Sequence, residues 1–182
     1  MATMSSRYFS DVRSGNVFIG STAAAGTALP ISTGTAVTFG LWNTSTAYDA
    51  VLIDIDIGYT SGTIAIGEFG IANQYCGFAI ATAAPLSTFT DGTPKNAYLG
   101  LGNASAMRFT PSAATLTAGG TAAKWLGGSN EIATASPGVS NMHYEFNGKL
   151  IVPPGQLVFL CGSVAQTGLF TASMTWAEVL RS

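Results

Sequence analysis

The sequence predicts an all-β protein, an antiparallel jelly-roll-like β-sandwich with an N-terminal arm. Three observations lead to this prediction. Apolar and polar residues alternate in short stretches, and turn residues recur roughly every dozen residues. No window of 11 or more residues carries a persuasive helical period. Many short strands in one chain of this kind are typical of a sandwich, and about eight of them fit a jelly roll.

The chain of 182 residues has the length of one domain, or of one domain plus an arm. Residues 1–34 are predicted to be the arm, used in docking or assembly. They are rich in small residues, and 17–19 is their only candidate strand. The arm would add little to the core and would dock on another molecule or on the edge of the domain. Residues 35–182 are predicted to form the jelly-roll domain.

The first strands of the domain are expected at residues 35–43, 50–59 and 63–71, with a polar turn at 43–47. The stretch 50–59 has the clearest alternation. It places four side chains on one face and three on the other, namely Val51, Ile53, Ile55 and Ile57 against Leu52, Asp54 and Asp56.

The middle of the chain, residues 72–141, is less regular. Its candidate strands are 76–82, 97–101, 107–110 and 124–126, and loops of small residues such as 115–123 and 127–141 separate them. Loops of that length in a small domain usually carry contacts.

The end of the chain is regular again. Asn147-Gly148 is a hairpin signal between the strands 142–146 and 149–152. Prolines 153 and 154 and Gly155 predict a hard turn before the buried strand 156–162. The last strand is expected at 170–176.

Composition excludes several functions. Charged residues make up only 9% of the chain and the net charge is -2, so a nucleic-acid partner is not expected. Ala, Gly, Ser and Thr together account for 88 of 182 residues. A surface with so few charges tends to associate with copies or partners. The alternative is a secreted soluble domain with a neutral coat.

No apolar run approaches the roughly 18 residues of a membrane span, so no membrane partner is expected. The apolar centre at 17–19 is too short for a signal peptide, which predicts use without secretion. In a reducing cytosol Cys76 and Cys161 would remain thiols. A disulfide between them stays open at this stage.

The sequence points to no enzyme, no cofactor and no metal site. His143 is the only histidine, and no Gly-x-Ser-x-Gly elbow or phosphate-binding glycine loop is present. Nothing singles out a pair of acids for glycoside hydrolysis. Asp54 and Asp56 share one face of a strand and could share a calcium ion. The simpler interpretation is that they mark a face turned to solvent or to another subunit.

The tryptophans differ in their surroundings. Trp42 and Trp176 fall in predicted strands and are expected to pack in a core or interface rather than to form a sugar platform. Trp125 lies between loops, beside Lys124. Trp125 and Lys124 are therefore the candidate contacts with a partner.

Five pieces of the sequence together carry a resemblance. They are Leu41-Trp-Asn43, Val51-Leu-Ile53, Gly58-Tyr-Thr-Ser-Gly-Thr63, Val152-Pro-Pro-Gly155 and Ser173-Met-Thr-Trp-Ala-Glu178. The chain resembles, over about 35–70 and 142–180, virion proteins of tailed bacteriophages that serve as jelly-roll decoration, cement or spike subunits.

The resemblance implies a non-enzymatic virion structural protein that decorates or cements a phage capsid. It would act as a symmetric homo-oligomer, with a trimer expected, and its partners would be copies of itself and the major capsid protein or other virion proteins. It would be located in the virion, assembled in the host cytoplasm. The alternative is a carbohydrate- or receptor-binding β-sandwich module of a viral spike or tail.

Overall fold

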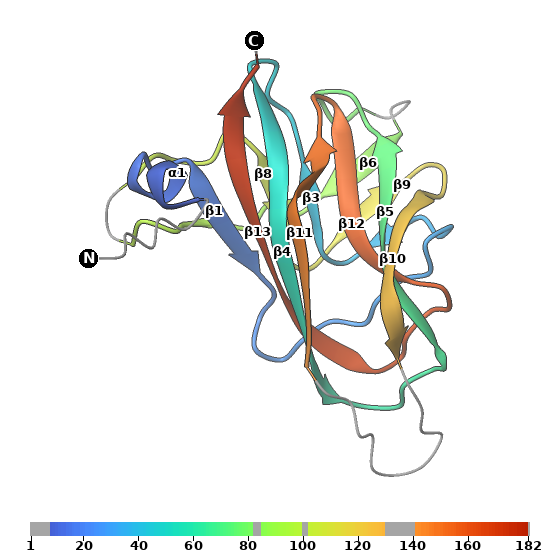
Figure 1. Cartoon of the computed structure of the whole chain (residues 1–182). Helices are drawn as coiled ribbons and strands as arrows, with labels where there is room; N and C mark the ends of the chain where they lie inside the picture. Colours follow the sequence, from blue (N-terminus) through green and yellow to red (C-terminus); the bar gives the residue numbers. More distant parts are fainter. Residues whose placement is uncertain (1–7, 82–84, 100–101, 130–140, 182) are drawn as a thin grey trace, which may run out of the picture.

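The computed structural model describes residues 8–81, 85–99, 102–129 and 141–181 (Figure 1). A five-residue helix, α1 (Phe9–Arg13), precedes the strands. The strands are β1 (Val17–Ser21), β2 (Ala36–Val37), β3 (Gly40–Trp42), β4 (Tyr48–Ser61), β5 (Gly67–Tyr75), β6 (Leu86–Phe89), β7 (Lys95–Asn96), β8 (Arg108–Thr110), β9 (Ala114–Leu116), β10 (Thr121–Ser129), β11 (Met142–Val152), β12 (Gln156–Gly162) and β13 (Leu169–Leu180).

The strands form three antiparallel sheets, which confirms the all-β sandwich. Sheet A has the order β11-β4-β13-β1-β7, and sheet B has the order β10-β5-β12-β3-β8. The small sheet C has the order β2-β9-β6. In Figure 1, β1, β13 and β4 lie on the left of the molecule, and β12, β5 and β10 lie on the right.

Eight strands of sheets A and B pair as a long hairpin folded over on itself. In chain order these strands are β1, β3, β4, β5, β10, β11, β12 and β13. The first pairs with the eighth, the second with the seventh, the third with the sixth and the fourth with the fifth. Each outer pair therefore encloses the pair inside it, and the first strand, β1, meets the last strand, β13, in sheet A.

The main core fills the space between sheets A and B. Aromatic rings dominate it: Phe109 packs edge-on against Phe39 and stacks on Trp176, with ring centres 5.2 and 6.0 Å apart. Such rings bury large apolar areas and prefer these geometries. Phe69 and Phe170 form a similar edge-on pair at 5.2 Å.

A bulge in β4 changes which side chains reach this core. Asp54 pairs with Thr175 but Leu52 pairs with Trp176, so Ile53 is an extra residue. Such a residue reverses the alternation along the strand. Leu52 is therefore buried in the core together with Ile55, and Val51 is only half-buried. The predicted faces of Val51 and Leu52, which precede the bulge, are wrong, and those of residues 54–57, which follow it, are correct.

Sheet C adds a third layer on the far side of sheet B. A second apolar cluster lies between them, in which Val37, Leu86 and Leu116 of sheet C share a core with Trp42 and Phe159 of sheet B. Both faces of sheet B are thus packed. Two strands of sheet C, β6 and β9, come from the long excursion between β5 and β10.

The segment predicted as an arm belongs in large part to the sandwich. The candidate strand at 17–19 is confirmed as β1, which pairs with β13 along its whole length. Phe18 and Leu29 are buried in the main core. Ile31 forms a further bridge to Gly162. The expectation that this segment adds little to the core is wrong for residues 17–31, because β1 supplies the partner that β13 needs. Of the two docking alternatives, the structure places it on the domain itself.

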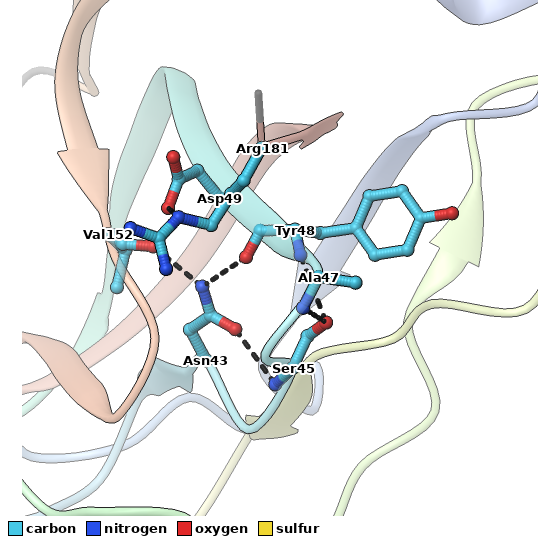
Figure 2. Close-up of polar contacts among 7 residues, drawn as sticks. All are labelled: Asn43, Ser45, Ala47, Tyr48, Asp49, Val152 and Arg181. Atoms are coloured by element: carbon cyan, nitrogen blue, oxygen red, sulfur yellow. Dashed lines mark hydrogen bonds and ion pairs between the residues drawn. The ribbon is translucent and has the colours of Figure 1, made fainter.

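Two of the motifs behind the resemblance lie against each other (Figure 2). The Asn43 side-chain amide donates to the carbonyls of Tyr48 and Val152, at 2.9 and 2.8 Å. The side-chain oxygen Oδ1 of Asn43 accepts from the Ser45 backbone amide at 2.9 Å, which forms the predicted polar turn. The backbone amide of Gly155 donates to the main-chain carbonyl of Asn43 at 2.8 Å. These hydrogen bonds therefore hold the turn between β3 and β4 against the turn between β11 and β12.

The middle strands match the prediction in part. The expected strands at 107–110 and 124–126 are confirmed as β8 and as part of β10. The expected strand at 76–82 is wrong for 76–81, and that at 97–101 is wrong for 97–99; the remaining residues of both, and most of the loop at 127–141, lie outside the described part. The loop expected at 115–123 is shorter, because β9 and β10 enter it.

Asn147 and Gly148 do not join two paired strands. Both have positive φ, 53° and 72°, as the hairpin signal requires. However, the residues on both sides pair with β4, so 146–149 face Ile53 alone. The hairpin prediction is wrong, and the turn is a protrusion from the edge strand β11. A protrusion of this kind hinders pairing of the edge with another strand.

The two cysteines are free and buried. Cys161 on β12 pairs with Gly70 on β5, and Cys76 lies six residues after Gly70 in the sequence. Six residues of strand span about 20 Å, whereas a disulfide needs Cα atoms within about 7 Å. Burial raises the pKa of each thiol to about 12, so both are inert thiols.

In the part of the chain that the structure describes, no helix is long and apolar enough to cross a membrane.

Candidate ligand and partner surfaces

The outer face of sheet A carries a ladder of polar side chains. One row runs from His143 on β11 through Asp56 on β4 to Ser173 on β13 and Ser21 on β1. These four residues are exposed or half-buried. Because sheet B is packed on both faces and sheet A on one, this face is the broad sheet surface turned to solvent.

A hollow of about 370 Å³ lies on this face, beside that row. Gly58, Asn141 and Thr171 are among the residues that line it. A Cβ on Gly58 would lie 2.9 Å from the Thr171 Oγ1 and 3.3 Å from the Asn141 Oδ1. The side chains of Thr171 and Asn141 therefore lie close together over Gly58, and only a glycine leaves room for both.

Hydrogen bonds and charges organise the rim of the hollow. His143 Nδ1 lies 2.7 Å from Asp56 Oδ1, and His143 Nε2 lies 3.5 Å from Glu145 Oε1. The hydrogen bond to Asp56 is the largest effect and raises the pKa of His143; burial opposes it, and the hydrogen bond to Glu145 adds a smaller rise. Burial raises the pKa of the neighbouring Asp54, against the hydrogen bond from Thr175.

The shared face predicted for Asp54 and Asp56 is confirmed, since both belong to the outward rows. Within the described residues, no group of three or more His, Cys, Asp or Glu side chains could hold a metal ion. The Asp56 Oδ1 lies 2.7 Å from the His143 Nδ1.

Lys124 and Trp125 leave β10 in different directions. The Lys124 Nζ lies 5.2 Å from the ring centre of Tyr144 on β11, a cation–π contact that joins the edges of sheets A and B. Trp125 packs over Gly70 on β5 and remains 40% exposed. Lys124 thus already has a partner within the chain, and Trp125 presents a free ring surface. Their predicted role in partner contact stays a prediction.

The other two tryptophans are fully buried, as the core alternative for them predicted. Trp42 also packs under Arg108, whose guanidinium carbon lies 5.0 Å from its ring centre. Arg108 in turn makes two hydrogen bonds to Asp91, of 2.7 and 2.6 Å. This cluster ties sheet B to the excursion that carries sheet C.

Sequence reasoning missed the hollow itself. It singled out His143 and Asp56, but not Gly58, Asn141 or Thr171 as residues that line the hollow. The alternation of Thr171, Ser173 and Thr175 was the available signal for a polar face. Only the register of β4 between β11 and β13 brings the two sides together.

Comparison with family models, with curated proteins and with solved structures finds no match for this chain. The functional inference therefore depends on the sequence and the geometry.

Proposed function

We propose that this chain is a jelly-roll subunit with a structural, non-enzymatic role in a bacteriophage virion. It decorates or cements the capsid as a symmetric oligomer, with three copies as the expected number. Its partners are other copies of itself and the major capsid protein or another virion protein.

The surface carries this proposal. Leu99, Ile66 and Leu180 are 79%, 69% and 67% exposed on a protein with only 9% charged residues. Large apolar side chains on a surface with few charges favour association, because little charge must be desolvated when surfaces meet. A subunit whose surface is covered by copies and partners has this character.

The pairing of the eight strands supports the jelly-roll assignment. A hairpin folded over so that the first strand meets the eighth and the fourth meets the fifth is what two interlocked Greek keys produce. Viral capsid and lectin domains use this architecture. This support is an analogy at the level of fold, since one fold serves many functions.

The test is sedimentation of native particles. Particles from cells that make the protein are separated on a density gradient, and the chain is quantified in each fraction by mass spectrometry beside the major capsid protein. We expect the chain to co-sediment with capsids at a constant ratio to that protein. Recovery only in the slow fractions, away from capsids, would rule the proposal out.

A further inference from the structure

We propose that the hollow over Gly58 on sheet A binds one neutral sugar ring of a surface glycan. This adds ligand recognition to the structural role. It is independent of that role, because a single chain contains all the residues involved.

The shape of the hollow fits a small polar ligand. Its volume of about 370 Å³ falls at the lower end of the usual range for ligand sites, roughly 300–1,000 Å³. Because Gly58 has no side chain, the Thr171 Oγ1 and the Asn141 Oδ1 lie within 2.9 and 3.3 Å of one point above it, so a bound ring rests on these two polar groups.

The lining offers both donors and acceptors at short range. The Asn141 amide can donate and accept, and Asp56 uses Oδ1 for His143, which leaves Oδ2 to accept. Thr171 donates to the Gly58 carbonyl at 3.3 Å and keeps its lone pairs for a ligand. A sugar hydroxyl both donates and accepts, so adjacent hydroxyls of one ring match this mixture.

The charges around the hollow select against acidic ligands. Asp56 lies in the row that borders the hollow, and Asp54 and Glu145 lie opposite each other in the next row along the sheet. His143 is the cation that faces these carboxylates when it is protonated. Carboxylates therefore outnumber the histidine. A sialic acid or a phosphate would be repelled, whereas a neutral sugar would gain charge-assisted hydrogen bonds to Asp56.

The hollow is shallow and open, so one site binds weakly. Affinity for a glycan-covered surface would come from several sites acting together, because the second binding event is intramolecular. The symmetric oligomer proposed above supplies such copies, and this step alone depends on it.

The test is a nitrogen-15 NMR titration of the whole chain. The probes are methyl glycosides of glucose, galactose and mannose, with N-acetylglucosamine, and N-acetylneuraminic acid is the acidic control. We expect at least one neutral sugar to shift the amides of Gly58, Asp56 and Thr171 in a saturable manner. The acidic control should leave them unchanged.

Two variants locate the site. Gly58→Ala should abolish the shifts, because the new methyl group displaces Thr171 and Asn141, two of the residues that line the hollow. Thr171→Val keeps the side-chain volume and should weaken binding about fivefold, the effect of one hydrogen bond. Thr121→Val is the matched control, since it makes the same exchange at an exposed position of sheet B. It should leave the dissociation constant unchanged.

Three outcomes would overturn the proposal. The first is no shift with any neutral sugar at saturating concentration. The second is a shift centred on the Trp125 indole, which would make that ring the sugar platform instead. The third is a shift at Gly58 caused by arginine methyl ester but by no sugar, which would assign the hollow to a basic side chain of a protein partner. None of these outcomes bears on co-sedimentation with capsids, so the two proposals fail separately.

Discussion

The indole of Trp125 lies over Gly70 on the neighbouring strand. A Cβ on Gly70 would stand 2.6 Å from Cε3 of the indole and 2.9 Å from its Cζ3. Glycine is therefore what allows the ring to rest on the sheet. A large aromatic side chain held in this way loses little conformational entropy when a partner covers its free face.

We expect Trp125→Ala to weaken attachment to the particle by about 2 kcal/mol, near thirtyfold, as truncation of a central aromatic contact does. The melting temperature should fall less than on truncation of the fully buried Trp42 or Trp176, because Trp125 is 40% exposed. Co-sedimentation at graded concentrations measures the first quantity and calorimetry the second. Tyr98→Ala is the control, since Tyr98 is a similarly exposed aromatic at 42%.

Substitution of Gly70 tests the same surface without changing Trp125 itself. Gly70→Ala should displace the indole and weaken attachment while Trp125 itself is unchanged. Full attachment of both Trp125→Ala and Gly70→Ala would mean that the docking surface lies elsewhere.

The oligomeric state is the second prediction. We expect light scattering coupled to size-exclusion chromatography to give three times the monomer mass of 18.6 kDa at micromolar concentration. The physical reason is the exposed apolar surface on a weakly charged chain. Leu180→Lys adds a charge at an exposed position and should shift the equilibrium toward monomer if that end is in the interface. A wild-type protein that stays monomeric at this concentration contradicts the prediction.

The sequence predicted the sandwich because alternation and turn residues are local signals. Val37, Phe39 and Leu41 and the turn at Asn43 indicate strands without any knowledge of their partners. Pairing is a property of distant segments, so β1 with β13 and β5 with β10 were not accessible in this way. The Asn147-Gly148 signal failed for the same reason. Its local geometry is right, but β4 pairs with the residues on both sides of it.

The candidate site shows the same limit. Asp56 and His143 were visible as polar residues on strands, yet they lie 87 positions apart and meet only through the register of β4 and β11. The bulge at Ile53 has no sequence signature in this stretch, and it reverses the faces of Val51 and Leu52. Register and bulges depend on packing across the whole core, which a local pattern does not contain.

The salt response is the third prediction. Seven basic residues and a net charge of -2 leave little scope for phosphate contacts. Attachment to the particle should therefore change by less than about twofold between low and physiological salt, because apolar contacts are weakly screened. The measurement is co-sedimentation in a salt series. Release of the chain on raising salt would indicate an electrostatic mode of attachment.

The fourth prediction concerns His143, the only histidine of the chain, whose proton resonance is therefore unambiguous. Its pKa in the folded protein should lie above that in the unfolded chain, because Asp56 hydrogen-bonds to the charged ring. The resulting stabilisation is present in full below the unfolded-state pKa and is lost as pH rises through the folded-state pKa. The effect on stability is small, since both side chains are more than half exposed and solvent screens them.

NMR titration of wild type and Asp56→Asn tests this. The variant should have the lower His143 pKa, because the amide no longer offers a negative charge. Lys149→Gln removes a charge further along β11 and serves as the control, with an unchanged pKa expected. Equal pKa values in wild type and Asp56→Asn would show that the 2.7 Å contact is not maintained in solution.

The last prediction concerns the N-terminal segment, where the structure revises the sequence-based expectation. Deletion of residues 1–34 removes the whole of β1 and uncovers the edge of β13 from Ser173 to Ala177. It also removes Phe18, which stacks on Trp176 with ring centres 6.0 Å apart. Loss of a buried Phe side chain alone costs about 3–5 kcal/mol, and the total stability of a domain is about 5–15 kcal/mol.

We therefore expect the chain lacking residues 1–34 to show no cooperative melting transition, and Phe18→Ala to melt well below wild type. Deletion of residues 1–7 is the matched control, because it keeps Tyr8, the N-cap of α1, and leaves β1 intact. This shorter deletion should keep the wild-type melting temperature by calorimetry and circular dichroism. If the chain lacking 1–34 folds with the near-ultraviolet spectrum of its tryptophans unchanged, then β13 does not depend on β1, and the segment returns to the role of a detachable arm. Because β1 is the first strand and β13 the last, the result also tests the closure of the folded hairpin.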